Sequence, residues 1–114
     1  MPLFSKEYKN FVRIIFIAYC TIILYLSFTP QTVEVANSDK LNHFLAFSVY
    51  AFLFFLAYSK NFIKIFLAVL LFGSFIEFVQ YFLPYRSCDL LDIIADCIGG
   101  ITGYIVTKFL FSRR

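Results

Sequence analysis

The chain contains four hydrophobic runs, each close to the ~20 residues that a helix needs to cross a lipid bilayer. They cover approximately residues 11–29, 41–59, 62–83 and 89–111. Pro30 follows the first run and Pro84 follows the third, where helices are expected to end. Because the links between the runs are short, consecutive helices should be antiparallel neighbours. The sequence therefore predicts one all-α domain over residues 1–114, an integral membrane four-helix up-down bundle.

The composition excludes two broad classes of protein. Of the 114 residues, 61% are hydrophobic and only 15% are charged. A soluble domain of this size buries too small a fraction of its surface to hide that much apolar area. The basic residues lie in short clusters beside the hydrophobic runs and form no continuous stripe, so nucleic-acid binding is not expected. The lipid bilayer is the expected partner.

The basic residues predict the orientation, because Lys and Arg in short flanking segments favour the cytoplasmic side. Eight of the ten fall in three segments that this topology places on one side, namely Lys6, Lys9, Arg13, Lys60, Lys64, Lys108, Arg113 and Arg114. The other side carries Lys40 and Arg86. Both termini are therefore predicted to be cytoplasmic, in a multi-pass protein of the cell membrane.

The acidic residues show the opposite distribution. Six of the seven lie toward the outer side: Glu34, Asp39, Glu77, Asp89, Asp92 and Asp96. Glu77 and Gln80 share one helix face, and the three aspartates from Asp89 onward share another. Counting residues from the turn between these helices predicts that Glu77 lies opposite Asp96 and Gln80 opposite Asp92. Arg86, in the turn, is expected to lie above them.

The start of the second helix adds three polar residues at the same membrane face. The full candidate polar site is Asp39, Lys40, His43, Glu77, Gln80, Arg86, Asp89, Asp92 and Asp96. Gly99 and Gly103 continue the acidic face of the last helix as a small-xxx-small pair, which lets another helix approach closely. We assign these two glycines to helix packing.

A purely structural interpretation competes with a binding site. Acids within a bilayer cost several kcal/mol unless they are neutralised, paired or hydrated. Asp92 or Asp96 could be protonated, or bridged to Arg86 and Gln80, and only hold the helices together. Polar contacts that only hold membrane helices together generally use Asn, Ser or Thr, which cost less free energy to bury than an acid. The convergence of several acids therefore favours a functional site.

Three segments in order resemble the VanZ-like family of membrane proteins. Residues 39–44, Asp-Lys-Leu-Asn-His-Phe, resemble the D-K-x-x-H-F start of that family's second helix. Residues 77–80, followed by Pro84 and Arg86, are similar to its E-x-x-Q…P-x-R segment. The spacing of its last helix is matched by Asp89, Asp92, Gly99 and Gly103. The resemblance covers about residues 25–107 and implies one VanZ-like transmembrane domain.

Two positions depart from the family pattern. Asp96 stands where the family usually has Asn, and Phe47 stands where it often has Tyr. The family is named for a protein associated with glycopeptide resistance. The resemblance therefore implies a role in the bacterial cell envelope, without an established reaction and without implying resistance for this chain.

Three functions fit the predicted site. The first is non-enzymatic binding of an anionic lipid or cell-wall-precursor head group, with Lys40 and Arg86 facing its charge. The second is a membrane-embedded transferase or hydrolase acting on a phospholipid or polyprenyl phosphate, with His43 as acid or base. If that enzyme needs a metal, the expected ligands are Glu77, Asp92 and Asp96, since hard cations favour carboxylate oxygens. The third is a transporter or proton relay, for which four helices are few unless the protein is a homo-oligomer.

The charge balance bears on the first two functions. Six outer acids against two bases and one histidine make a poor site for a bare phosphate. A bound metal or protonated acids would make phosphate binding plausible. The sequence leaves any cofactor, the ligand and the oligomeric state open.

Overall fold

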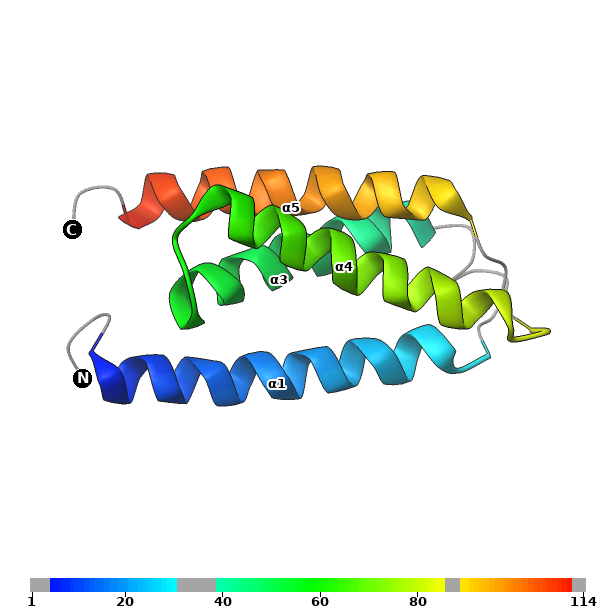
Figure 1. The fold of residues 1–114 in the computed structure, drawn as a ribbon, viewed down its shortest axis with the longest axis horizontal. Helices are drawn as coiled ribbons and strands as arrows, with labels where there is room; N and C mark the ends of the chain where they lie inside the picture. Colours follow the sequence, from blue (N-terminus) through cyan, green and yellow to red (C-terminus); the bar gives the residue numbers. More distant parts are fainter. Residues whose placement is uncertain (1–4, 31–38, 86–88, 112–114) are drawn as a thin grey trace.

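The computed structural model describes residues 5–30, 39–85 and 89–111. These residues form α1 (Lys6–Phe28), α3 (Asp39–Ala57), α4 (Phe62–Tyr81) and α5 (Leu90–Phe111). Each helix runs antiparallel to the next along the chain, so α1 begins at the same end of the bundle where α5 ends (Figure 1). The bundle is elongated, with extents of 46 × 23 × 23 Å. The predicted all-α four-helix bundle is confirmed.

Local hydrogen bonds set the helix ends. Ser5 Oγ accepts a hydrogen bond from Tyr8 N at 3.1 Å, so α1 begins at Lys6, within the basic flank and before the hydrophobic run. Asn61 Oδ1 accepts from Lys64 N at 3.1 Å and begins α4 in the same way. At the other end of α4, Phe82 N donates to Val79 O at 3.0 Å, which tightens the last turn. The helix therefore ends at Tyr81, before Pro84.

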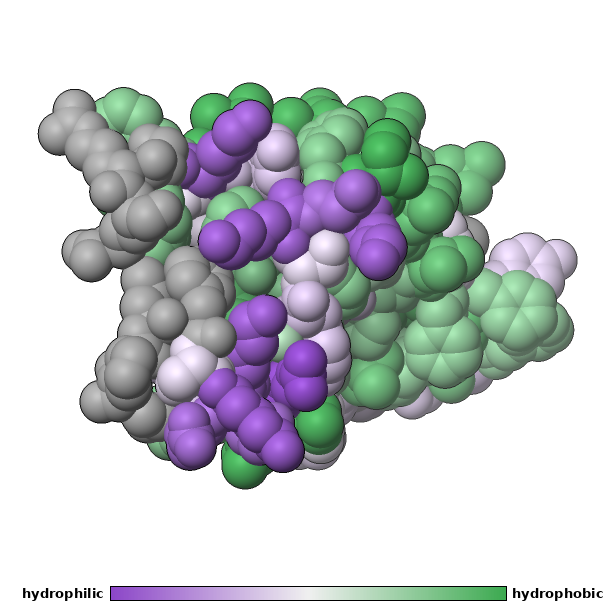
Figure 2. Space-filling view, turned by 60° about the vertical axis from the view of Figure 1, so that its left-hand side comes forward, coloured by the Kyte–Doolittle hydropathy of each residue, from purple (hydrophilic) through white to green (hydrophobic). Residues whose placement is uncertain are grey.

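All four helices are long and apolar enough to span a membrane, judged by length and composition. Large apolar side chains point outward, as in Leu71 and Phe109, which are 70% and 76% exposed. Figure 2 shows a hydrophobic flank, with hydrophilic side chains gathered toward the end of the bundle where α1 begins and α5 ends. A hydrocarbon solvent removes the cost of such a surface. The chain is therefore a multi-pass membrane protein.

The backbones of α3 and α5 approach each other through two glycines. A Cβ at Gly99 would collide with the carbonyl oxygen of Phe44, and one at Gly103 would collide with that of Ser48. The Ser48 hydroxyl lies across the same contact and is 2.9 Å from Phe44 O and 3.0 Å from Gly99 O. This close contact holds the start of α3 beside the start of α5.

The remaining interior is apolar. Phe47 is buried and contacts the rings of Tyr50 and Phe72, with centroids 5.4 and 5.9 Å away. Val69 of α4 packs against Gly100 of α5. The ring at position 47, one of the two departures from the VanZ-like pattern, therefore lies in a hydrophobic cluster.

The predicted orientation can be tested with Cys88, which lies outside the described residues, in the sequence between α4 and α5. With both termini cytoplasmic, an impermeant maleimide should label Cys88 in intact cells, whereas Cys20 and Cys97 fall within membrane-spanning helices. Labelling should disappear in Cys88→Ser. Labelling of Cys88 only after lysis would reverse the assigned orientation.

Candidate functional site

Polar side chains from three helices meet at the end of the bundle where α3 and α5 begin and α4 ends. The start of α3 contributes Lys40 and His43, the last turns of α4 contribute Glu77, and the start of α5 contributes Asp92 and Asp96, preceded by Asp89. The three acids within α4 and α5 are almost fully buried: Glu77 and Asp92 are 2% exposed, and Asp96 is 0% exposed. We refer to these six residues as the polar cluster.

Lys40 joins α3 to α5 at the outer edge of the cluster. Its Nζ lies 2.7 Å from Asp89 Oδ2 and 2.7 Å from Asp92 Oδ1. The lysine side chain is 49% exposed, whereas that of Asp92 is 3% exposed. The hydrogen bond from Lys40 holds the pKa of the Asp89 carboxyl below its usual range, so Asp89 stays ionised at neutral pH. Asp89 also caps α5, with Oδ1 accepting from Leu91 N at 2.9 Å.

His43 lies below Lys40 and contacts two aspartates. Its Nδ1 is 2.6 Å from Asp96 Oδ1, and its Nε2 is 3.6 Å from Asp92 Oδ2. The histidine side chain is 11% exposed. With Asp96 ionised, Nδ1 carries a proton and donates it to Asp96 Oδ1. Asp96 thus fixes the orientation of the ring.

Glu77 completes the cluster from α4. Its Oε2 accepts a hydrogen bond from Asp89 N at 3.1 Å. Its Oε1 is buried and has no hydrogen-bond partner among the residues that the structure describes. A buried carboxylate oxygen without a donor is costly, and this atom therefore needs an explanation.

Three of these residues come close enough to share a cation. One potential ligand atom from each of His43, Glu77 and Asp92 lies within 4.8 Å of the other two. The sequence had placed Asp96 in this trio and His43 outside it. In the structure Asp96 lies behind the histidine ring, bonded to Nδ1.

The predicted pairing of α4 with α5 is wrong by about one helical turn. Asp96 Oδ2 lies next to Gly73 instead: a Cβ added to Gly73 would be only 2.5 Å from this oxygen. Gln80 does not face Asp92: its Nε2 donates to Ser27 O of α1 at 2.8 Å. The prediction treated residues 84–88 as the whole turn, but α4 ends at Tyr81 and α5 begins at Leu90.

Two predicted site residues have side chains outside the part of the chain that the structure describes. Arg86 lies outside the described residues, and Asp39 begins α3 with its side chain outside them. Gly73 was missed by the sequence reasoning. Its spacing of four residues before Glu77 puts it on the same helix face, and this signal could have marked it as the contact for a side chain of α5.

The fold and the cluster define a class: a small multi-pass membrane protein with buried acids at one end of a helical bundle. The profile of the VanZ/LLP1 family matches residues 16–111. The chain belongs to this family.

A fission yeast protein described as "Uncharacterized protein C11E3.10", from Schizosaccharomyces pombe, is 33% identical over 108 residues. The match covers 90% of this chain, which spans 66% of the length of that relative. No solved structure matches the chain significantly.

Proposed function

We propose that this protein binds the head group of a membrane lipid in the polar cluster, without chemical turnover. The observation that carries the proposal is the half-exposed Lys40 above buried acids at one end of an otherwise apolar bundle. Charged groups inside membrane proteins usually mark a ligand path or site. The cluster lies at the ends of spanning helices, the depth at which head groups meet acyl chains.

The charges of the cluster suit a zwitterionic or amine-bearing phospholipid. The Lys40 ammonium can meet a phosphate, while the carboxylate of Asp89 beside it, 42% exposed, can accept from an amine. Both groups are at the surface, so a head group could reach them without opening the bundle.

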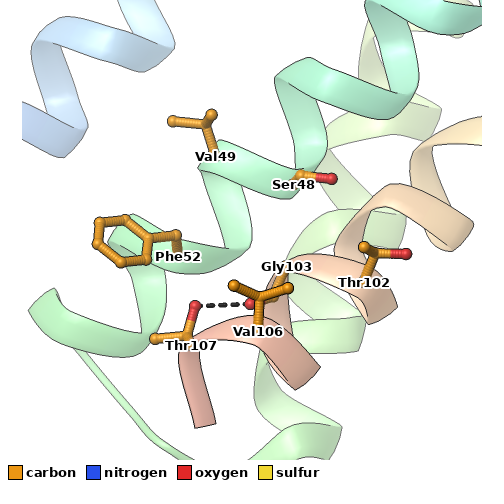
Figure 3. A pocket seen from close by; sticks show the side chains of 7 residues that line it. All are labelled: Ser48, Val49, Phe52, Thr102, Gly103, Val106 and Thr107. Atoms are coloured by element: carbon orange, nitrogen blue, oxygen red, sulfur yellow. Dashed lines mark hydrogen bonds between the residues drawn. The ribbon is translucent and has the colours of Figure 1, made fainter. Parts of the chain in front are cut away.

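A shallow groove along the same two helices suits an acyl chain. It has a volume of about 160 Å³ and is lined by Ser48, Val49, Phe52, Thr102, Gly103, Val106 and Thr107. Figure 3 shows these side chains on facing turns of α3 and α5, with the Thr107 hydroxyl turned back to Gly103 O at 2.6 Å. Ser48 is eight residues beyond Lys40, or about 12 Å along α3. The groove is therefore at acyl-chain depth below the cluster.

The relative in a fission yeast favours a phospholipid over a cell-wall precursor as the ligand. Fungi have phospholipids but no peptidoglycan. A ligand common to this chain and that relative would be one that fungal membranes contain.

Replacing Lys40 should weaken lipid binding. Hydrogen bonds to charged groups contribute about 1.5–3 kcal/mol, so Lys40→Gln should lower phospholipid affinity roughly 10- to 100-fold. Native mass spectrometry of the purified protein with phosphatidylethanolamine measures retained lipid directly. Lys64→Gln is the matched control, because Lys64 is exposed near the start of α4, at the other end of the bundle. Equal retention by the two variants would reject the proposed site.

A second candidate function has one observation in its favour. Asp96 orients His43 so that Nε2 faces the cluster, as in a general base held by a carboxylate. A hydrolase or transferase acting on the same lipid would need such a group. Head-group release from a labelled phospholipid by the wild-type protein, lost in His43→Ala, would favour this enzyme over simple binding.

A further inference from the structure

We propose that His43, Glu77 and Asp92 bind a divalent transition-metal ion, with Zn²⁺ as the representative ion. The inference deepens the proposed function, since it rests on the same polar cluster being a ligand site. It begins from the three ligand atoms that lie within 4.8 Å of one another. Atoms that share one such ion, each about 2.0–2.2 Å from it, lie roughly 3–4 Å apart. The 3.6 Å between His43 Nε2 and Asp92 Oδ2 already fits.

Each of the three side chains is anchored through one polar atom. His43 Nδ1 is held by Asp96, Asp92 Oδ1 by Lys40, and Glu77 Oε2 by the backbone N–H of Asp89. The three potential ligand atoms that lie within 4.8 Å of one another therefore come from side chains whose directions are already set. Such outer contacts fix the direction of metal ligands before the ion arrives.

Glu77 Oε1 is the independent observation that points to a ligand. It is buried on a residue that is 2% exposed, and no donor among the described residues reaches it. A cation would satisfy this oxygen. Without a cation, this oxygen carries a desolvation cost unless Glu77 or the neighbouring Asp92 holds a proton.

The charge of the cluster also favours a cation. Glu77, Asp92 and Asp96 place three carboxylates in the interior, and the basic side chain that the structure describes beside them, Lys40, is shared with Asp89. A divalent ion would offset the negative charge that the described residues gather here. Carboxylates alone would repel a phosphate group. A bound divalent ion would attract it, because the ion could bind a phosphate oxygen.

The donor set selects the kind of ion. Mg²⁺ and Ca²⁺ prefer all-oxygen sites, whereas an imidazole nitrogen suits Zn²⁺ and its transition-metal neighbours. A histidine whose other nitrogen donates to a carboxylate is the usual second-shell arrangement of such sites. Three protein ligands would leave a coordination position for water or a lipid oxygen.

Calorimetric titration of the delipidated protein in detergent with Zn²⁺ alone tests the proposal. We expect one ion per chain, with little competition from Mg²⁺. His43→Ala and Glu77→Gln should each weaken binding at least tenfold, and the absorption spectrum of Co²⁺ in the site should show nitrogen and oxygen ligands without thiolate bands. Glu7→Gln, which changes an exposed acid at the other end of the bundle, and Cys88→Ser should bind normally.

Two results would overturn the metal site. One is the absence of stoichiometric Zn²⁺ binding to the wild-type protein, and the other is binding that His43→Ala and Glu77→Gln leave unchanged. Circular dichroism and elution volume show whether each variant remains folded, and Glu77→Gln is nearly isosteric. Because no lipid is present, failure here is distinguishable from failure of the Lys40 experiment.

Discussion

Replacing Gly103 with leucine should separate α3 from α5 and unfold the bundle at temperatures that the wild-type protein withstands. A side chain at this position would collide with the backbone carbonyl of Ser48. A backbone carbonyl in a helix cannot rotate away, whereas the end of a flexible side chain can. Overpacking costs about 1–3 kcal/mol when side chains can adjust, and we expect the upper end of that range or more here. The corresponding fall in Tm is on the order of 10 °C.

Thermal melts followed by circular dichroism in detergent measure this loss. Ile105→Leu is the matched control, because Ile105 lies two residues along α5 but is 59% exposed on the lipid-facing surface. It should melt like the wild-type protein. A Gly103→Leu melt that matched the control would show that the close approach of the two backbones is unnecessary for stability.

The fold was predictable because one property determines it. Four apolar runs of membrane-spanning length, joined by short links, permit few arrangements other than an up-down bundle. The start of α1 was less predictable. The hydrophobic run begins near Phe11, but the helix begins earlier, at Lys6, after the cap at Ser5. Caps and polar flanks extend a helix beyond the part that lipid selects.

The pairing of side chains between helices was not predictable in the same way. Residues 82–89 all lie between α4 and α5, and a shift of three or four residues in such a link moves a facing side chain by one turn. The sequence marked His43 and Asp96 as site residues, but their contact depends on the approach of α3 to α5 at Gly99. That approach is a property of the packed bundle.

Asp96 is one of the two positions that depart from the VanZ-like pattern, and Asp96→Leu should abolish the orientation of His43. The leucine cannot accept from Nδ1, so the ring loses its 2.6 Å contact and Nε2 is no longer directed into the cluster. Loss of an outer-shell partner of this kind typically lowers metal affinity 10- to 100-fold, and we expect that loss in a Zn²⁺ titration.

Asp96→Asn separates hydrogen bonding from charge at the same position. Its amide oxygen can still accept from Nδ1, so the ring should stay oriented and Zn²⁺ affinity should fall less than in Asp96→Leu. A structural role alone predicts a different order, in which both variants lower the Tm and neither alters Zn²⁺ binding. Near-wild-type affinity in Asp96→Asn would mean that the acceptor, rather than the negative charge of Asp96, positions His43.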